Sequence, residues 1–265
     1  MQTLVFHKYH GLGNDFVLLD SRKDKLDGID IKKLAIDVCD RHFGIGADGI
    51  LIVWPSTKAH YRMQILNPDG SEAEMCGNGI RCFTKYVFET DKLKEEVISI
   101  ETPAGIILPA IIPSSNPTVT TVEVDMGIPS EQGKIELYGL TFNKVSMGNP
   151  HAICLVGDFG QIDFYDLGPK IEHDPHFPQR TNVEFVKVLN DKEIEIKVWE
   201  RGAGETMACG TGACASMVAA HSAGKVGRKI IAHLPGGALE IEWNDDNHIL
   251  MRGPAEKVFE GTYSV

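Results

Sequence analysis

Two short stretches of the sequence place a cysteine directly before a glycine-rich turn. The first reads Cys76-Gly-Asn-Gly and the second reads Cys209-Gly-Thr-Gly, and helical patterns follow both, so we predict helices over 77–89 and 210–222. A helix start exposes unpaired backbone N–H groups and the positive end of the peptide dipoles, which favour a thiolate. Each cysteine is therefore predicted to have a lowered pKa and to act as an acid or a base.

The same turns can also bind an anion. Glycines allow the backbone to approach a bound group closely, and the N–H groups at a helix start can hold a carboxylate. With two such turns, one thiolate could remove a proton from a carbon atom while the other thiol delivers one, which would invert that carbon. The hydrogen beside an amino acid's carboxylate is weakly acidic, so stabilising the developing negative charge is the main requirement.

Cysteines also have roles outside catalysis. A lone cysteine is usually a small buried apolar residue, and this reading applies to the four others, Cys39, Cys82, Cys154 and Cys214. A zinc site combining Cys76 and Cys209 with Cys82 and Cys214 would need Cys-x5-Cys and Cys-x4-Cys spacings, which fit structural zinc sites poorly. A redox disulfide between Cys76 and Cys209 is a further alternative, although the sequence has no Cys-x-x-Cys.

Composition restricts the partners that we expect. The 265 residues carry 26 Lys and Arg against 37 Asp and Glu, a net charge of −11, which argues against binding a nucleic-acid backbone. No apolar run approaches the roughly 20 residues that span a bilayer, and the start of the sequence lacks the pattern of a secretion signal. We therefore expect a cytoplasmic protein with no membrane or nucleic-acid partner, whose sparse cysteines stay reduced.

The sequence contains an internal repeat. Three landmarks recur in one order at nearly one spacing: Asn14 and Asn149 (149 − 14 = 135), His42 and His176 (176 − 42 = 134), and Cys76 and Cys209 (209 − 76 = 133). A shared offset at three separate places favours a duplicated domain over coincidence.

The duplication predicts an α+β fold of two pseudo-symmetric domains. Each half offers several strand-like segments and one rather apolar helix, so we predict a mostly antiparallel sheet curled around a central helix in each. The predicted domains are 1–117 and 118–254, and residues 255–265 could return to the first. The segment 113–118 (PSSNPT) is the predicted joint.

Five ordered motifs together resemble the diaminopimelate epimerase family over nearly the whole chain. They are GLGNDF at 11–16, NPDGSEAEMCGNGIRC at 67–82, SMGNPHA at 146–152, TNVEF at 181–185 and WERGAGETMACGTGACA at 199–215. The resemblance implies two pseudo-symmetric domains with the active site in the cleft between them. It also implies a cofactor-independent, metal-free isomerase of lysine and peptidoglycan precursor synthesis, which interconverts LL- and meso-diaminopimelate.

The resemblance also implies roles for individual residues. Cys76 and Cys209 become the two acid/base residues, and His151 and Glu200 tune or relay protons to the thiols through a His–Glu contact. Substrate-binding positions are Asn14, Asn67, Gly77, Asn78, Asn149, Asn182, Glu200, Arg201, Gly210 and Thr211. Carboxamides suit a zwitterion because they donate and accept without adding charge, and Arg201 offers a fork to the distal carboxylate.

Several of these assignments have plainer alternatives. Asn14 and Asn149 follow glycines, which is typical of turns, while His151 and Glu200 could be a solvated histidine and a surface glutamate. Gly49 stands where some relatives have Gln, so the loop 41–50 is a doubtful source of side-chain contacts.

Different functions also compete with the epimerase. Another two-thiol racemase, acting on proline or hydroxyproline, is the nearest alternative, and a non-catalytic ligand-binding or redox-sensing protein is a second. The family resemblance implies a homodimer, although Phe259 stands where some relatives have a Tyr linked to the dimer contact.

Overall fold

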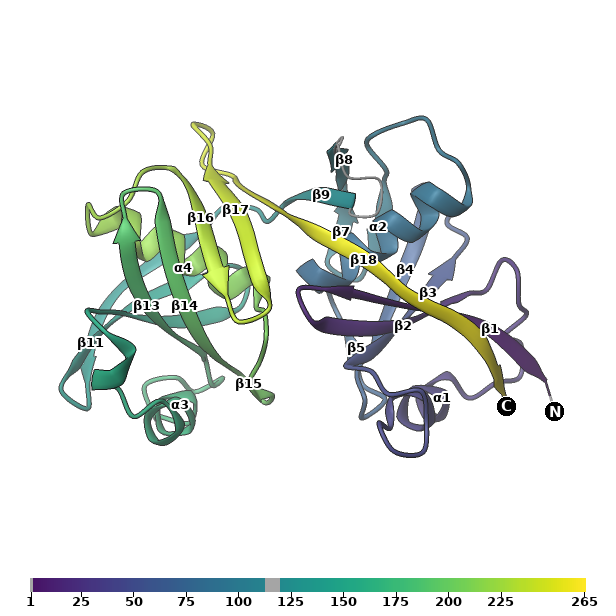
Figure 1. The fold of residues 1–265 in the computed structure, drawn as a ribbon, viewed down its shortest axis with the longest axis horizontal. Coiled ribbons are helices and arrows are strands. Elements are labelled where there is room, and N and C mark those ends of the chain that lie inside the picture. Colours follow the sequence, from purple (N-terminus) through teal and green to yellow (C-terminus); the bar gives the residue numbers. More distant parts are fainter. Residues whose placement is uncertain (1, 113–119) are drawn as a thin grey trace. The chain divides into compact units, whose positions relative to one another are not determined.

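A computed structural model describes residues 2–112 and 120–265 of the chain (Figure 1). The chain divides into two compact units, one formed by Met1–Val124 with Gly253–Val265 and the other by Asp125–Arg252. The predicted boundary between 117 and 118 and the whole predicted joint at 113–118 fall in 113–119, outside the described residues. No helix among those described has the length and apolar composition needed to cross a membrane.

The first unit combines a mixed sheet with two helices. Its strands are β1 (Thr3–Gly11), β2 (Asn14–Asp20), β3 (Gly49–Trp54), β4 (Tyr61–Leu66), β5 (Glu72–Ala73), β6 (Ile100–Thr102), β7 (Gly105–Ile107), β8 (Ala110–Ile112), β9 (Thr120–Asp125) and most of β18 (Ile249–Ser264). Its helices are α1 (Ile31–Cys39) and α2 (Gly77–Thr90). The end of β18, yellow in Figure 1, pairs antiparallel with β1 from Thr3↔Ser264 to His10↔Glu256.

The second unit repeats this plan. Its strands are β10 (Ser130–Leu137), β11 (Leu140–Ser146), β12 (Pro150–Val156), β13 (Asn182–Asn190), β14 (Glu193–Glu200), β15 (Gly204–Glu205), β16 (Lys229–Leu234) and β17 (Gly237–Trp243). Its helices are the short 3-10 helix η1 (Phe159–Gln161), α3 (Phe164–Glu172) and α4 (Gly210–Ser222).

Strand pairing repeats element by element. In the first unit β1–β2 is antiparallel, β2–β3 parallel, β3–β4 antiparallel, β4–β6 parallel and β6–β7 antiparallel. The series β11–β12, β12–β13, β13–β14, β14–β16 and β16–β17 has the same orientations in the same order. The first residues of β3 and β13, and of α2 and α4, are both 133 apart (182 − 49 and 210 − 77). The predicted α+β fold with an internal duplication is therefore confirmed.

One helix in each unit is the central one. Residues 77–87 of α2 are all buried, and the helix packs on β1 to β4. In α4 small residues lie on every side, and its neighbours are β11 to β14, β16 and β17. Small side chains let a helix be surrounded by strands, because backbone and sheet can approach closely. The predicted helix over 210–222 matches α4, and α2 extends one residue beyond the predicted 77–89.

The prediction of a single helix in each half is wrong, because α1 and α3 are also present. Nine residues is short for a periodic signal. Helix α1 is stabilised locally by Asp30, whose side chain accepts the Lys32 and Lys33 N–H groups. Helix α3 contains Gly168 and Pro169, both poor helix formers, and Gly168 lies against the ring of Trp199. Tertiary packing therefore stabilises α3 where local preference does not.

Candidate active site

Both signature cysteines are the N-terminal caps of the central helices. Cys76 has an extended backbone (φ −139°, ψ 119°), and its Sγ accepts the Gly79 N–H at 3.4 Å. Cys209 has φ −117° and ψ 107°, and its Sγ accepts the Gly212 N–H at 3.3 Å. Each sulfur thus occupies the place that a serine or aspartate oxygen usually takes at a helix start. The predicted position of both cysteines at helix starts is confirmed.

Gly212, the third residue of α4, has no room for a side chain beside Cys209. A Cβ at Gly212 would lie 2.5 Å from Glu184 Oε1 and 3.1 Å from Cys209 Sγ, both closer than van der Waals contact allows. At the matching position in the first unit, a Cβ at Gly79 would meet Leu51 Cδ2 at 3.3 Å. The second unit therefore packs a carboxylate and a thiol against the backbone where the first unit packs a leucine.

These contacts predict unequal effects for two matched substitutions. We expect Gly212→Ala to lower the free energy of unfolding by about 1–3 kcal/mol, because the added methyl overpacks a fully buried group, and to displace the Cys209 thiol. Gly79→Ala should cost less, because only the end of a leucine side chain must move. Urea denaturation of both variants measures the difference, and an equal loss in the two would contradict this account.

The surroundings of Cys76 are polar and centred on Asn14. Asn14 Oδ1 accepts the Asn78 Nδ2 donor at 3.0 Å and lies 3.8 Å from Cys76 Sγ. Its Nδ2 donates to Asp48 Oδ2 at 2.9 Å, and Arg41 in turn bonds Asp48 at 2.7 Å. Asn14 begins β2 directly after a turn with positive φ at Leu12 and Gly13, so it is a turn residue that also contacts the thiol.

A buried arginine, Arg81, supports the start of α2. Its side chain is 0% exposed and donates to Gly77 O (3.0 Å), Asn78 Oδ1 (2.8 Å) and Pro254 O (3.2 Å). The guanidinium therefore fixes both residues that follow Cys76. No sequence motif singles out this residue, since an arginine in a helix normally suggests an exposed face.

Asn67 lies in a different local setting from Asn14. Its side chain donates to Ser71 Oγ at 2.9 Å, within the turn that joins β4 to β5. The hydrogen bond of its carboxamide thus stabilises a turn. That Asn67 contacts the substrate stays a prediction.

The surroundings of Cys209 form a chain of hydrogen bonds. Thr211 Oγ1 lies 3.6 Å from Cys209 Sγ and accepts Asn149 Nδ2 at 3.3 Å. Asn149 Oδ1 is 3.0 Å from His151 Nε2, and His151 Nδ1 is 2.7 Å from Glu184 Oε1. Because His151 is 1% exposed, the alternative of a solvated histidine is wrong.

The carboxylate that contacts His151 is Glu184, which is not among the residues predicted from the sequence. Glu200 was the expected acid, yet its side chain bonds the Thr206 hydroxyl and the Cys209 thiol. Two signals could have identified Glu184. It follows Asn182 by two residues in a strand, so both side chains lie on one face, and a glutamate between Val183 and Phe185 interrupts an apolar run.

Asn182 and Arg201 are joined through the backbone. Asn182 Nδ2 donates to Pro150 O at 3.0 Å, and its Oδ1 accepts the Arg201 N–H at 3.0 Å. The Arg201 side chain is exposed and bonds Gln179 O at 3.2 Å. Asn182 therefore fixes the position from which the Arg201 guanidinium extends.

The electrostatics of the second thiol differ from the prediction. Burial raises the pKa of Cys209 well above its ordinary value, and the charges of Glu200 and Glu184 raise it further. Burial, with a smaller contribution from the charge of Glu184, also raises the pKa of the Glu200 carboxyl. The lowered pKa expected from the helix start is therefore wrong for Cys209, because desolvation opposes a thiolate more strongly than the N–H groups favour it.

The other four cysteines belong to the core. All are buried, and burial raises the pKa of Cys39 and Cys82 to about 12 and that of Cys154 to about 11. Within the described ranges, no three histidine, cysteine, aspartate or glutamate side chains gather in a way that could hold a metal ion.

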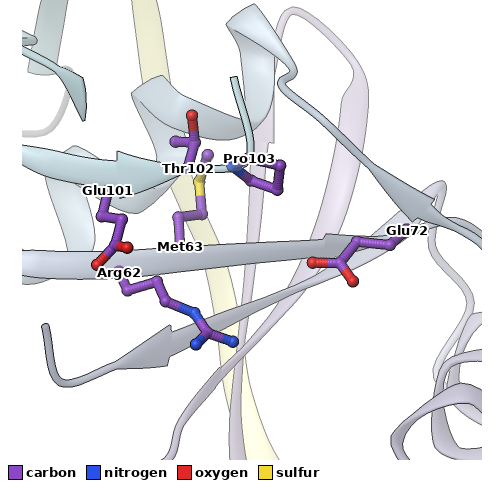
Figure 2. Close-up of a pocket in the computed structure, with 6 residues that line it drawn as sticks. All are labelled: Arg62, Met63, Glu72, Glu101, Thr102 and Pro103. Atoms are coloured by element: carbon purple, nitrogen blue, oxygen red, sulfur yellow. The ribbon is translucent and has the colours of Figure 1, made fainter. Parts of the chain in front are cut away.

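A pocket elsewhere in the first unit lies apart from the predicted residues. Figure 2 shows its lining, which consists of Arg62, Met63, Glu72, Glu101, Thr102 and Pro103. It contains neither a cysteine nor a histidine, and none of the residues predicted for the site line it.

Comparisons with known proteins agree with the resemblance in the sequence. The family model described as diaminopimelate epimerase matches residues 6–131 and 143–258. The diaminopimelate epimerase of Pelotomaculum thermopropionicum is 48% identical over 275 residues, which cover 97% of this chain and 98% of that protein.

Solved structures share the fold at low identity. A phenazine biosynthesis protein of the PhzF family from Bacillus anthracis has a TM-score of 0.79 at 17% identity, with 100% of both chains covered. A hydroxyproline epimerase from Agrobacterium vitis has a TM-score of 0.70 at 15% identity and covers 99% of this chain and 91% of its own. These two similarities establish the two-domain architecture and nothing about the substrate.

Proposed function

Because this chain belongs to the diaminopimelate epimerase family, we propose that it interconverts LL- and meso-2,6-diaminopimelate by exchanging the hydrogen on one α-carbon. It is an isomerase that works in lysine and peptidoglycan precursor synthesis. The observation that carries the proposal is the repeated cap: in each unit a cysteine directly precedes the first residue of the central helix, and its sulfur accepts the N–H three residues on.

In the proposed reaction Cys76 and Cys209 act on opposite faces of the α-carbon. One sulfur, as thiolate, takes the α-hydrogen as a proton, and the other, as thiol, gives a proton to the opposite face. The proton count is unchanged, and the two sulfurs exchange roles in the reverse direction. A base whose pKa is raised by burial, as that of Cys209 is, binds a proton more strongly and so suits a weak carbon acid.

The helix starts are proposed to stabilise the charge that develops on the substrate. Gly77 and Asn78 in one unit, and Gly210 and Thr211 in the other, supply the backbone N–H groups of the first helical turn. Donors fixed in a water-poor site stabilise an enolate-like carboxylate without having to reorganise during the reaction.

Polar side chains are proposed to recognise the rest of the zwitterion. Asn14 and Asn149 lie within the hydrogen-bond networks of the two thiols. Asn67, Asn182 and the exposed guanidinium of Arg201 are proposed to bind the distal amino and carboxylate groups. Glu200, whose pKa burial raises, is proposed to exchange protons with Cys209.

Hydrogen exchange in deuterium oxide tests this function. The protein, treated with a chelator and given no pyridoxal phosphate, is incubated separately with LL-diaminopimelate, L-proline and trans-4-hydroxy-L-proline. We expect deuterium at the α-carbon and conversion to the meso isomer with diaminopimelate alone. Exchange confined to proline or hydroxyproline would favour the racemase alternative, and no exchange under reducing conditions would favour a non-catalytic protein.

The proposal places the enzyme in the cytoplasm, because catalytic thiols need a reducing compartment, and it includes a homodimer. Strand β18 carries exposed apolar side chains, among them Val258 and Phe259, which are 54% and 46% exposed. Neighbouring exposed apolar side chains are suited to burial against a second copy.

The dimer gives a specific prediction. Phe259→Lys should weaken self-association by about 2 kcal/mol, or roughly 30-fold, as loss of an aromatic anchor usually does. Sedimentation velocity over a range of concentrations measures this change. Ile36→Lys is the matched control, since Ile36 is 48% exposed on α1, and an equal effect of both substitutions would argue against β18 as the interface.

A further inference from the structure

A chain of four side chains, buried at one end, connects a carboxylate to the start of α4. It runs from Glu184 through His151 and Asn149 to Thr211, with successive separations of 2.7, 3.0 and 3.3 Å. Glu184 is 0% exposed and His151 is 1% exposed. The far end, Thr211 Oγ1, lies 3.6 Å from Cys209 Sγ.

The chemistry of these groups determines where the protons are. Asn149 Oδ1 can only accept, so His151 Nε2 must carry a proton. On the other side of the ring, Nδ1 faces a carboxylate oxygen, so a second proton lies between Nδ1 and Glu184 Oε1. An imidazole is ordinarily a stronger base than a carboxylate.

We propose that Glu184 is a positioning residue that keeps His151 doubly protonated, so that the imidazolium orients the Asn149 carboxamide toward Thr211 and the Cys209 thiol. With Oδ1 bound to the ring, Asn149 directs Nδ2 to Thr211 Oγ1. Thr211 then uses its oxygen as the acceptor, and its O–H is left to donate to Cys209 Sγ. This inference rests on the proposed function, because it explains how one of its two thiols is prepared.

The first unit has different residues at the positions that match His151 and Glu184. The β2–β3 register pairs Phe16 with Gly49, and the β12–β13 register pairs His151 with Asn182. Phe16 therefore corresponds to His151, and Gly49 corresponds to Asn182 (182 − 49 = 133). Two residues after these glycine and asparagine positions, Leu51 corresponds to Glu184 (184 − 51 = 133). The fold itself is satisfied by an apolar pair here, so the ion pair in the second unit is not needed for packing.

The carboxamides of Asn14 and Asn149 are consequently held in opposite orientations relative to the two thiols. Asp48 accepts Nδ2 of Asn14, which turns Oδ1 toward Cys76, while His151 donates to Oδ1 of Asn149, which turns Nδ2 toward Thr211. The Asn14 network thus presents an acceptor to the first thiol. The Asn149 network presents the Thr211 hydroxyl as a donor to the second thiol, which also contacts the Glu200 carboxylate. The duplicated halves are made chemically unequal by Asp48 in one and Glu184 in the other.

Burying Glu184 has a cost that supports a specific role. Its Oε2 has no hydrogen-bond partner among the described residues, and an incompletely bonded buried carboxylate is destabilising. The neighbouring titratable groups are Glu200 and Cys209, and burial shifts both of them toward their protonated forms. Glu184 is thus the acid best placed to balance a charged His151.

Nitrogen-15 NMR of histidine-labelled whole protein, without substrate, tests this inference. The His151 signal, one of ten histidines, is assigned by its loss in His151→Gln. We expect both ring nitrogens to be protonated at neutral pH in the wild type, and only one in the near-isosteric Glu184→Gln. Deuterium exchange by Glu184→Gln should fall about 100-fold, because the carboxamide is no longer held in place.

The control is Asp20→Asn, which removes another buried carboxylate, bonded to Arg22 and Tyr86. It should lower stability yet leave the His151 signal and the exchange rate near wild type. An unprotonated ring nitrogen in the wild type, or a doubly protonated ring in Glu184→Gln, would overturn the inference whether or not the variant is active. Correct ring protonation in a protein that exchanges no diaminopimelate would instead overturn the proposed function alone.

Discussion

Replacing Cys76 or Cys209 by alanine is expected to abolish epimerisation. The rate constant kcat should fall by ~10²- to 10⁴-fold, the usual contribution of a positioned acid or base. Inversion needs a proton removed on one face and a proton delivered on the other, so either variant lacks one half of the exchange. Chiral chromatography of the product measures inversion, and mass spectrometry in deuterium oxide measures α-hydrogen exchange in the same sample.

Folding must be preserved for this result to be informative. Cys76 is partly exposed and Cys209 is 5% exposed, so the second substitution should cost somewhat more stability. Cys154→Ala is the matched control, because Cys154 is buried in the core of the second unit away from the helix starts. It should lose stability but retain turnover. Inversion at wild-type rate in either active-site variant would show that one base is sufficient.

The largest effect on stability is expected from Arg81→Ala. The substitution removes a fully buried side chain and leaves Gly77 O, Asn78 Oδ1 and Pro254 O without its guanidinium donors. A cavity combined with unsatisfied buried acceptors should lower the free energy of unfolding by about 3–5 kcal/mol. Chemical denaturation with urea measures this loss directly.

The duplicated fold provides the control for Arg81. Residue 214 is its counterpart in α4 (214 − 81 = 133), and Cys214 is also 0% exposed. Cys214→Ala removes only a sulfur atom and should cost about 1 kcal/mol. If Arg81→Ala were as mild as Cys214→Ala, the arginine could not be what holds the start of α2.

Some features followed from local sequence because their causes are local. A cap, two glycines and a run of helix-forming residues specify a helix start, which is why α4 spans the predicted 210–222 and α2 differs from its predicted range by one residue. The nearly constant offset between repeated landmarks, of which Cys76 and Cys209 are one pair, indicated the duplication. Each half must form the same strand pairings in the same order, so the spacing between landmarks is kept.

Other features of the structure could not be predicted from local sequence patterns. Helix α3 contains Gly168 and Pro169, and it packs against Trp199, a residue 27 positions beyond its C-terminal Glu172. His151 was expected to work with Glu200, but it is bonded to Glu184 on the neighbouring parallel strand. Which of two glutamates reaches a histidine depends on strand register and on the face each side chain occupies.

By itself, the sequence determined the two-domain α+β architecture, the family and the pair of cysteines at helix starts, because these depend on residue types at short or constant spacing. The tertiary structure alone decided the environment of the second thiol. Burial, together with Glu184 and Glu200, raises the pKa of Cys209 against the effect of its helix. Desolvation is a property of everything packed around an atom, and segments far apart in the chain supply that packing.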